Sequence, residues 1–187
     1  MKILKYVLGI IALLVLVFIL IGAFASEIAY DDEITVNKPL AECWAVSQDE
    51  DKMADWLVGF EGIEHISGPK DQVGSVSDVY ITDNGQKYTI RETITAIVPN
   101  ESISMTFTSD YSDMDYTLRM ADVDGKTKIS SSTKVKGKGI FYSSLMAIMS
   151  STIKAQEETN LANLKRTIEA NTKDYSPSPA EEEVEQE

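Results

Sequence analysis

The sequence from Gly139 to Asn171, GIFYSSLMAIMSSTIKAQEETNLANLKRTIEAN, decides the fold. It contains no proline, and its apolar residues recur at the three- and four-residue spacing of one helix face. A helix of this length extends over roughly 45 Å, which is too long for a small core to surround on every side. We therefore expect a wide sheet to lie against this helix, and the residues that precede it supply the strands.

The region between residues 63 and 136 has the two-residue periodicity of β-strands, interrupted by residues that favour turns. Strands are predicted at residues 63–67, 74–82, 87–98, 102–109, 115–123 and 127–136. Asp83-Asn84-Gly85 and Asp124-Gly125 are typical of hairpins, so neighbouring strands should pair antiparallel. A further strand at 28–37 brings the predicted sheet to about seven strands.

Two short helices are predicted between the first strand and the others. Pro39 suits the first turn of a helix that continues to about Ser47, and a second helix runs from Lys52 to about Val58. The predicted fold is therefore α+β, with a curved antiparallel sheet wrapped round a long C-terminal helix.

The N-terminal residues 6–25, YVLGIIALLVLVFILIGAFA, carry no charge and are long enough to cross the apolar core of a bilayer. Lys2 and Lys5 precede them, which predicts a single-pass anchor with a cytoplasmic N-terminus and a periplasmic or extracellular domain. A cleaved signal peptide is the alternative, because Ala23-Phe24-Ala25 fits a cleavage site. The predicted organisation is an anchor at 1–26, a globular domain at 27–171 and a disordered acidic tail at 172–187.

The composition excludes several classes of function. A formal net charge of −13 disfavours nucleic acid as a partner, because phosphate binding needs a basic surface. The single cysteine, Cys43, and the single histidine, His65, rule out an intrachain disulfide and a histidine-rich metal site. The sequence has no glycine-rich phosphate loop and no nucleophile elbow, so we expect no metal and no cofactor. It indicates no particular protein partner.

Three local motifs, together with the order of the predicted elements, resemble a known superfamily. They are ITVNKPLAECWAVSQDEDKMADWL, GIEHISG followed by VGSVSDVYI, and KVKGKGIFYSSLMAIM. They resemble the START-like helix-grip superfamily, also called SRPBCC, and in particular its polyketide cyclase/dehydrase-like members. The resemblance covers about residues 28–171. It implies a helix-grip fold that holds an apolar ligand between the sheet and the last helix, because members of this superfamily bind or transform many apolar molecules.

The inner face of the predicted sheet mixes aliphatic, aromatic, methionine and hydroxyl side chains. Such a mixture is a poor composition for a dry, close-packed core and predicts a cavity for a membrane lipid or an apolar small molecule. Strand alternation and the helix pattern give the expected ligand-binding residues as Tyr88, Ile90, Glu92, Met105, Phe107, Tyr116, Leu118, Thr133, Leu145 and Met149.

Glu92 is the candidate catalytic residue. By alternation it points inward with Ile90 and Ile94, and a carboxyl group among apolar neighbours has a raised pKa that suits an acid or base. A cyclase or dehydratase is therefore an alternative to a simple binding protein. Glu92 can instead reach water at the mouth of the sheet or pair with a basic residue. A third alternative is an interaction module with a filled core and no ligand.

One corner of the domain is predicted to face the membrane. In the helix-grip fold the first and last strands pair antiparallel, which places Ile28 beside Val135 and close to the anchor. The predicted membrane-facing residues combine basic and aromatic side chains that suit an anionic lipid surface, namely Lys134, Lys136, Lys138, Phe141 and Tyr142. We expect this corner to be the mouth through which ligands exchange with the membrane. The alternative is that the lysines only solubilise an edge and that the apolar turn belongs to the core.

Overall fold

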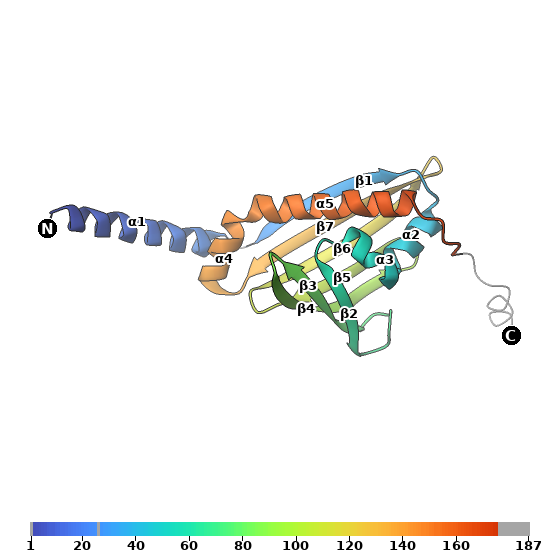
Figure 1. The fold of residues 1–187 in the computed structure, drawn as a ribbon, viewed down its shortest axis with the longest axis horizontal. Coiled ribbons are helices and arrows are strands. Elements are labelled where there is room, and N and C mark those ends of the chain that lie inside the picture. Colours follow the sequence, from blue (N-terminus) through green and yellow to red (C-terminus); the bar gives the residue numbers. More distant parts are fainter. Residues whose placement is uncertain (1, 26, 176–187) are drawn as a thin grey trace.

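The computed structural model describes residues 2–25 and 27–175. Its elements in chain order are α1 (Lys2–Phe24), β1 (Ile28–Val36), α2 (Leu40–Gln48), α3 (Glu50–Trp56), β2 (Phe60–Ser67), β3 (Val76–Asp83), β4 (Gln86–Val98), β5 (Ser102–Thr108), β6 (Ser112–Val123), β7 (Lys126–Gly137), α4 (Gly139–Ile148) and α5 (Ser150–Glu169). The strands described form one antiparallel sheet in the order β1-β7-β6-β5-β4-β3-β2. Helix α5 lies across one face of this sheet (Figure 1). The predicted α+β helix-grip fold is confirmed.

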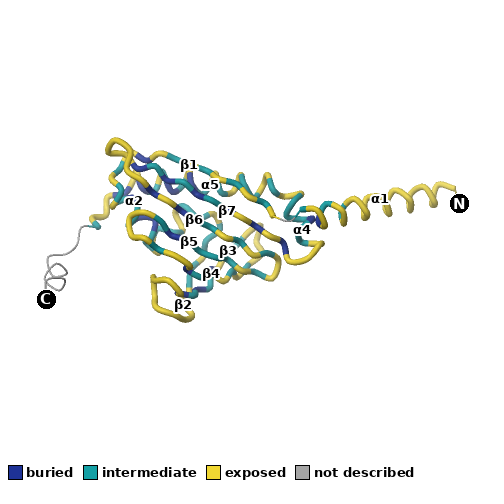
Figure 2. The backbone as a smooth tube through the Cα atoms, turned by 180° about the vertical axis from the view of Figure 1, so that it is seen from behind, coloured by how far each residue is buried: buried dark blue, intermediate teal, exposed yellow. Residues whose placement is uncertain are grey.

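The hydrophobic core lies where the C-terminal half of α5 meets α2 and one end of the sheet (Figure 2). Leu161, Leu164 and Ile168 of α5 are at most 2% exposed. Their partners come from β1, α2 and the central strands, namely Val36, Cys43, Val46, Ile94, Ile103, Leu118, Met120 and Ile129. Because each such side chain contributes about 1.5–3 kcal/mol when buried, this end of the domain fixes α5 on the sheet.

The single long helix predicted for residues 139–171 is two helices in the structure. The break is at Met149, whose backbone angles are φ −89° and ψ 4°. Helix α5 packs on β1, α2 and α3, whereas α4 packs on β7 and on α1. Apolar periodicity continues through the break, which is why the sequence pattern did not reveal it.

Helix α4 is in close contact with the end of α1. The Ser144 hydroxyl donates to the carbonyl oxygen of Phe18 over 2.6 Å, and the rings of Phe18 and Phe141 lie 5.6 Å apart. Gly22 faces this contact, where a Cβ atom would overlap the Ile140 carbonyl oxygen and the Ser144 hydroxyl. α1 is long and apolar enough to cross a membrane, although a signal sequence near an N-terminus meets the same criterion.

Strand β4 departs from simple alternation, and the pairing of β2 with β3 is also irregular. The pairing of β4 with β5 shifts between Ile94 and Ala96, which is a β-bulge. After the bulge Ile97 packs against the core and Ala96 is exposed, although uninterrupted alternation would place Ala96 inside.

The described chain continues to pack on the domain after α5. Lys173 Nζ lies 2.8 Å from Asp49 Oδ2, and the Tyr175 hydroxyl donates to the same oxygen over 2.6 Å. These hydrogen bonds hold the pKa of the Asp49 carboxyl below its usual range. The rest of the predicted acidic tail, residues 176–187, lies outside the described residues.

Candidate functional site

The inner face of the sheet is packed at one end and open at the other. At the packed end Ile103 and Leu118 are each 4% exposed. Toward α4, however, the inward side chains are only half-buried, namely Tyr88, Ile90, Met105, Phe107 and Met114. This open end therefore presents apolar and aromatic groups that the protein itself covers only in part, and it lies at the same end of the sheet as α1 (Figure 1).

The sheet brings most of the predicted ligand-binding residues together. Met105 lies opposite Tyr116, and Tyr116 lies opposite Thr133, so these three form one row across β5, β6 and β7. Glu92 and Phe107 are paired in the next row. Leu118 belongs instead to the packed core.

The two predicted ligand-binding residues on the C-terminal helix have a different setting. Leu145 lies within α4, and Met149 lies at the junction of α4 with α5, where it is 41% exposed. Their positions therefore depend on the packing of α4 against α1 and β7 rather than on α5.

Glu92 is half-buried at the open end, between Ser77 of β3 and Phe107 of β5. Burial raises the pKa of its carboxyl group to about 7, and the charges of Asp71 and Glu50 contribute to the rise. Within the described residues it forms no ion pair. A carboxyl group with this pKa is present in both protonation states at neutral pH, as a general acid or base requires.

The histidine and the cysteine have structural settings. The His65 ring nitrogens lie 3.2 Å from the Gly68 carbonyl oxygen and 3.4 Å from the Ser75 hydroxyl, so the ring ties together the loop after β2. Cys43 is completely buried, and burial raises the pKa of its thiol. A buried thiol with a raised pKa is a small core side chain rather than a nucleophile.

A cluster of polar side chains lies beneath α5, next to the open end. The Tyr116 hydroxyl donates to Glu157 Oε1 of α5 over 2.9 Å. Burial raises the pKa of the Glu157 carboxyl, and the charge of Asp32 on β1 raises it further. Burial also raises the pKa of Tyr116 well above its ordinary value and that of Tyr30 to about 12. Each of these shifts reflects ionisable groups held away from water.

Three oxygens of this cluster are buried without a hydrogen-bond partner in the described part of the chain. They are Asp32 Oδ2, Ser131 Oγ and Thr133 Oγ1. Asp32 lies opposite Ser131 across the β1–β7 pair. The two hydroxyls offset part of the rise in pKa that burial causes at Glu157 and Tyr30, but they do not reach hydrogen-bond geometry with either group. Buried polar groups normally have hydrogen-bond partners, and these three oxygens are therefore able to accept further hydrogen bonds.

Asp32 and Glu157 were not among the predicted site residues, although the sequence contains a signal for each. Asp32 is two residues from Tyr30 and two residues from Ile34 along β1, and it therefore shares their inward face. Glu157 precedes Leu161 by four residues and Leu164 by seven, which places it on the buried face of the helix. The spacing alone therefore places an acidic residue at an inward position of β1 and another at an inward position of α5.

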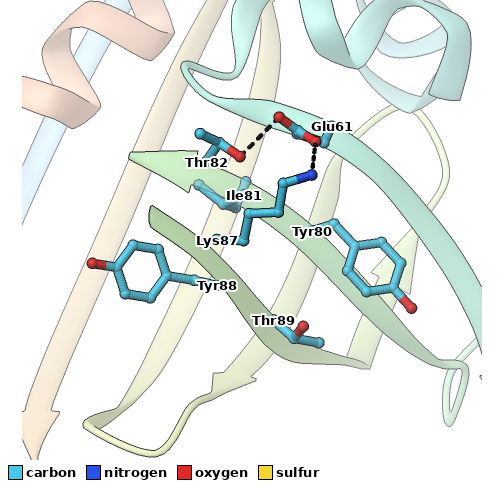
Figure 3. Close-up of a pocket in the computed structure, with 7 residues that line it drawn as sticks. All are labelled: Glu61, Tyr80, Ile81, Thr82, Lys87, Tyr88 and Thr89. Carbon is cyan, nitrogen blue, oxygen red and sulfur yellow. Dashed lines mark hydrogen bonds and ion pairs between the residues drawn. The ribbon is translucent and has the colours of Figure 1, made fainter. Parts of the chain in front are cut away.

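A separate pocket of about 320 Å³ lies on the β3–β4 hairpin (Figure 3). It is lined by Glu61, Tyr80, Ile81, Thr82, Lys87, Tyr88 and Thr89. Glu61 accepts from the Thr82 hydroxyl over 2.8 Å and from Lys87 Nζ over 3.1 Å. Only Tyr88 belongs to the predicted ligand-binding set, and an ion pair in the lining suits an apolar ligand poorly.

The sequence model of the family described as "Polyketide cyclase / dehydrase and lipid transport" matches residues 27–169, which is most of the chain. The chain belongs to this polyketide cyclase/dehydrase and lipid transport family. No curated protein matches it.

Solved structures share the fold of this family member at low sequence identity. The Zhui aromatase/cyclase from Streptomyces sp. R1128 is 14% identical with a TM-score of 0.66, covering 81% of this chain and 99% of its own. Ara h 8.0201 is 16% identical with a TM-score of 0.62, covering 78% and 99%. TTHA0849 from Thermus thermophilus is 13% identical with a TM-score of 0.64, also covering 78% and 99%. At these identities the likeness concerns the fold alone.

An aromatic series links the open end of this polyketide cyclase/dehydrase-like domain to α1, which precedes the family match. Tyr88 contacts Tyr111 at 6.4 Å between ring centroids, and Tyr111 contacts Tyr142 at 5.3 Å. Tyr142 contacts Phe141 at 5.3 Å, and Phe141 contacts Phe18 of α1 at 5.6 Å. The predicted membrane-facing aromatic residues therefore lie between β4 and the apolar N-terminal helix.

The predicted basic group lies on the edge of the same corner. Ile28 is paired with Val135, as the expected strand order requires. Lys134 and Lys136 are exposed on the opposite face of β7 from α5, across from Asp115 and Asp113 of β6.

Lys138 follows β7 and lies 3.3 Å from Asp113 Oδ1. Nearby aspartates therefore offset part of the positive charge of this basic group, and Lys138 has the most direct acidic partner.

Proposed function

We propose that this protein binds an apolar small molecule or a membrane lipid between its sheet and α5, and that α1 holds it at a membrane. The observation that carries the proposal is the open end of the inner face, where Ile90, Met105 and Phe107 are only half-buried. Apolar and aromatic side chains with a few polar groups among them are the usual lining of a ligand site. The family description, which includes lipid transport, supports the same ligand class.

The packing of α4 supports a retained anchor rather than a cleaved signal peptide. Ser144 is completely buried, and α1 provides part of its surroundings. Loss of α1 would uncover this side chain and the apolar surface around it. The lysines at positions 2 and 5 support a cytoplasmic N-terminus, with the domain on the periplasmic or extracellular side.

Ligands exchange with the membrane at the corner where α1, α4 and the open end meet. Phe141 is 61% exposed and Ile148 is 57% exposed, so α4 offers apolar surface beside the membrane helix. Lys134 and Lys136 add attraction to anionic headgroups, which is worth about 1 kcal/mol for each lysine near the surface. Lys138 contributes less because Asp113 neutralises it.

The test is to identify molecules that co-purify with the full chain, using native mass spectrometry after gentle detergent extraction. Phe107→Asp places a charge on the inner apolar face, whereas Thr108→Asp places the same charge on the outer face of the same strand as a matched control. We expect an apolar molecule on the wild-type protein and on Thr108→Asp, and much less on Phe107→Asp. Equal amounts on all three proteins would mean that the molecule binds at α1 instead.

A second candidate function rests on Glu92. A half-buried carboxyl group with a pKa of about 7 at the open end suits acid–base chemistry on a bound ligand, as in a cyclase or dehydratase. The test is turnover of the molecule recovered above, measured against pH. Catalysis by Glu92 requires a limb of the pH–rate profile near pH 7 that disappears in Glu92→Gln.

A further inference from the structure

The buried cluster beneath α5 contains polar oxygens that have no partner in hydrogen-bond geometry among the described residues. Ser131 is 2% exposed and Thr133 is 1% exposed, and neither hydroxyl oxygen has a hydrogen-bond partner in the described residues. Asp32 Oδ2 is in the same condition. All three belong to the inward faces of β1 and β7, and α5 packs against β1. Desolvated polar groups are stable only when another polar group meets them.

The cluster is also acidic and lacks a cation. Asp32 on β1 is paired with Ser131 on β7, and its charge helps to raise the pKa of the Glu157 carboxyl group on α5. Among the described residues no lysine or arginine forms an ion pair with either carboxyl group. The Tyr116 hydroxyl satisfies only one oxygen of Glu157, so acceptor capacity remains on both carboxyl groups.

We infer that this cluster binds the protonated amino group of an apolar amine, with Asp32 and Glu157 supplying the negative charge and Ser131 and Thr133 accepting hydrogen bonds. The inference rests on the proposed function and adds the chemistry of the polar end of the ligand. The apolar part of the amine lies toward Met105 and Phe107, which continue the inner face from Tyr116 to the open end.

An ammonium group fits the cluster better than other polar groups. It offers three donors and one positive charge, whereas carboxylates only accept and the two hydroxyls are free to accept. A carboxylate ligand would add a third negative charge to a buried site, which desolvation strongly disfavours. A metal ion has less support, because the described residues contain no group of three or more histidine, cysteine or acidic side chains placed to hold one.

The experiment compares three probes of equal chain length, octylamine, octan-1-ol and octanoate. Binding to the full chain in phosphatidylcholine nanodiscs is measured by isothermal titration calorimetry, with empty nanodiscs subtracted. We expect octylamine to bind about ten-fold more tightly than octan-1-ol, because a charge-assisted contact is worth at least about 1.4 kcal/mol. Octanoate should bind most weakly.

Matched variants separate the cluster from the general acidity of the protein. Asp32→Asn and Glu157→Gln should each reduce the preference for octylamine over octan-1-ol to about two-fold or less, which is the change expected when one charge of the site is lost. Asp31→Asn and Glu158→Gln remove one charge from exposed neighbouring positions and should keep the full preference. Thr133→Val, which preserves side-chain shape, should weaken octylamine binding and leave octan-1-ol binding unchanged.

Two outcomes would overturn the amine site, and a third would count against the proposed function. Equal binding of octylamine and octan-1-ol by the wild-type protein would overturn the amine site, as expected if the cluster holds only water, and would leave the proposed apolar binding intact. A preference for octylamine that survives in Asp32→Asn and Glu157→Gln would also overturn the site, because overall charge would then explain it. Failure of all three probes to bind would count against the proposed function itself.

Discussion

The Ser144 hydroxyl donates a 2.6 Å hydrogen bond to the backbone carbonyl oxygen of Phe18, which joins α4 to the N-terminal helix. The Ile140 carbonyl oxygen, one turn earlier in α4, lies 2.8 Å from the same hydroxyl, so the single hydroxyl proton is shared between the two carbonyl oxygens. A small residue at the facing position, Gly22, lets the two helices approach this closely. Close packing of small residues is typical of helix pairs within membranes. The globular domain is therefore connected to α1 by side-chain packing as well as by the chain.

This contact predicts that substitution of Gly22 is destabilising and that substitution of Gly9 is not. Gly22→Leu should push α4 away and lower the stability of the domain by about 1–3 kcal/mol, because no space exists for the added side chain. Gly9→Leu should have no such effect, since nothing lies within 4 Å of that position. The measurement is the melting temperature of the full chain in nanodiscs. Equal melting temperatures for the two variants would show that α4 does not depend on α1.

Glu92 predicts a specific pH dependence of stability. Its pKa is about 7 in the folded protein and near 4.5 ordinarily, so the folded state holds the proton more tightly. This contribution is fully present below pH 4.5 and is lost as the pH rises through 7. The expected loss is about 3 kcal/mol, because each pKa unit between the two values corresponds to about 1.4 kcal/mol.

The measurement for Glu92 is the change in melting temperature between pH 4.5 and pH 8. Glu92→Gln should remove this part of the pH dependence and should be the more stable protein at pH 8. Glu101→Gln, at an exposed turn, should behave like the wild-type protein. An unchanged pH dependence in Glu92→Gln would contradict the raised pKa.

Leu118 and Phe107 both face inward, but they should contribute differently to stability and to ligand binding. Leu118→Ala should cost about 2–5 kcal/mol of stability, because Leu118 is 4% exposed in the packed core. Phe107→Ala should cost less, because Phe107 is half-buried at the open end, but it should weaken binding of octan-1-ol. Thermal unfolding and calorimetry measure the two effects. If Phe107→Ala proved as destabilising as Leu118→Ala and bound octan-1-ol normally, Phe107 would belong to the core.

Particular residues show how far the sequence predicts this structure. The strands follow from alternation and turn residues, and the expected pairing of Ile28 with Val135 is present. The break at Met149 did not follow, because α4 and α5 are both apolar on one side and differ only in the elements on which they pack. Alternation failed at the bulge near Ala96, where one extra residue changes the face. Asp32 lies near the start of the domain's sequence and Glu157 near its end. The sequence alone therefore does not show that the two residues belong to one cluster in the fold.

The last prediction concerns the depth of α4. Phe18 lies six residues before the end of α1, or roughly 9 Å along the helix axis. Because Phe141 contacts Phe18, an α1 that spans the bilayer brings the start of α4 to the depth of the acyl chains. An environment-sensitive fluorophore attached at position 141 in a Phe141→Cys variant, with the buried Cys43 changed to Ala, should emit at shorter wavelength in nanodiscs. Lipids brominated on their acyl chains should quench it.

The matched control for α4 is the same fluorophore at Val123, which is exposed at the end of β6, at the other end of the sheet. It should show neither the shift nor the quenching. Lys134→Gln with Lys136→Gln should leave the signal at position 141 unchanged in neutral lipid, since burial of apolar surface and the contact with Phe18 hold α4 there. If the fluorophore at position 141 were as little quenched as that at position 123, α4 would lie outside the acyl chains, and ligand exchange would then need a route through water.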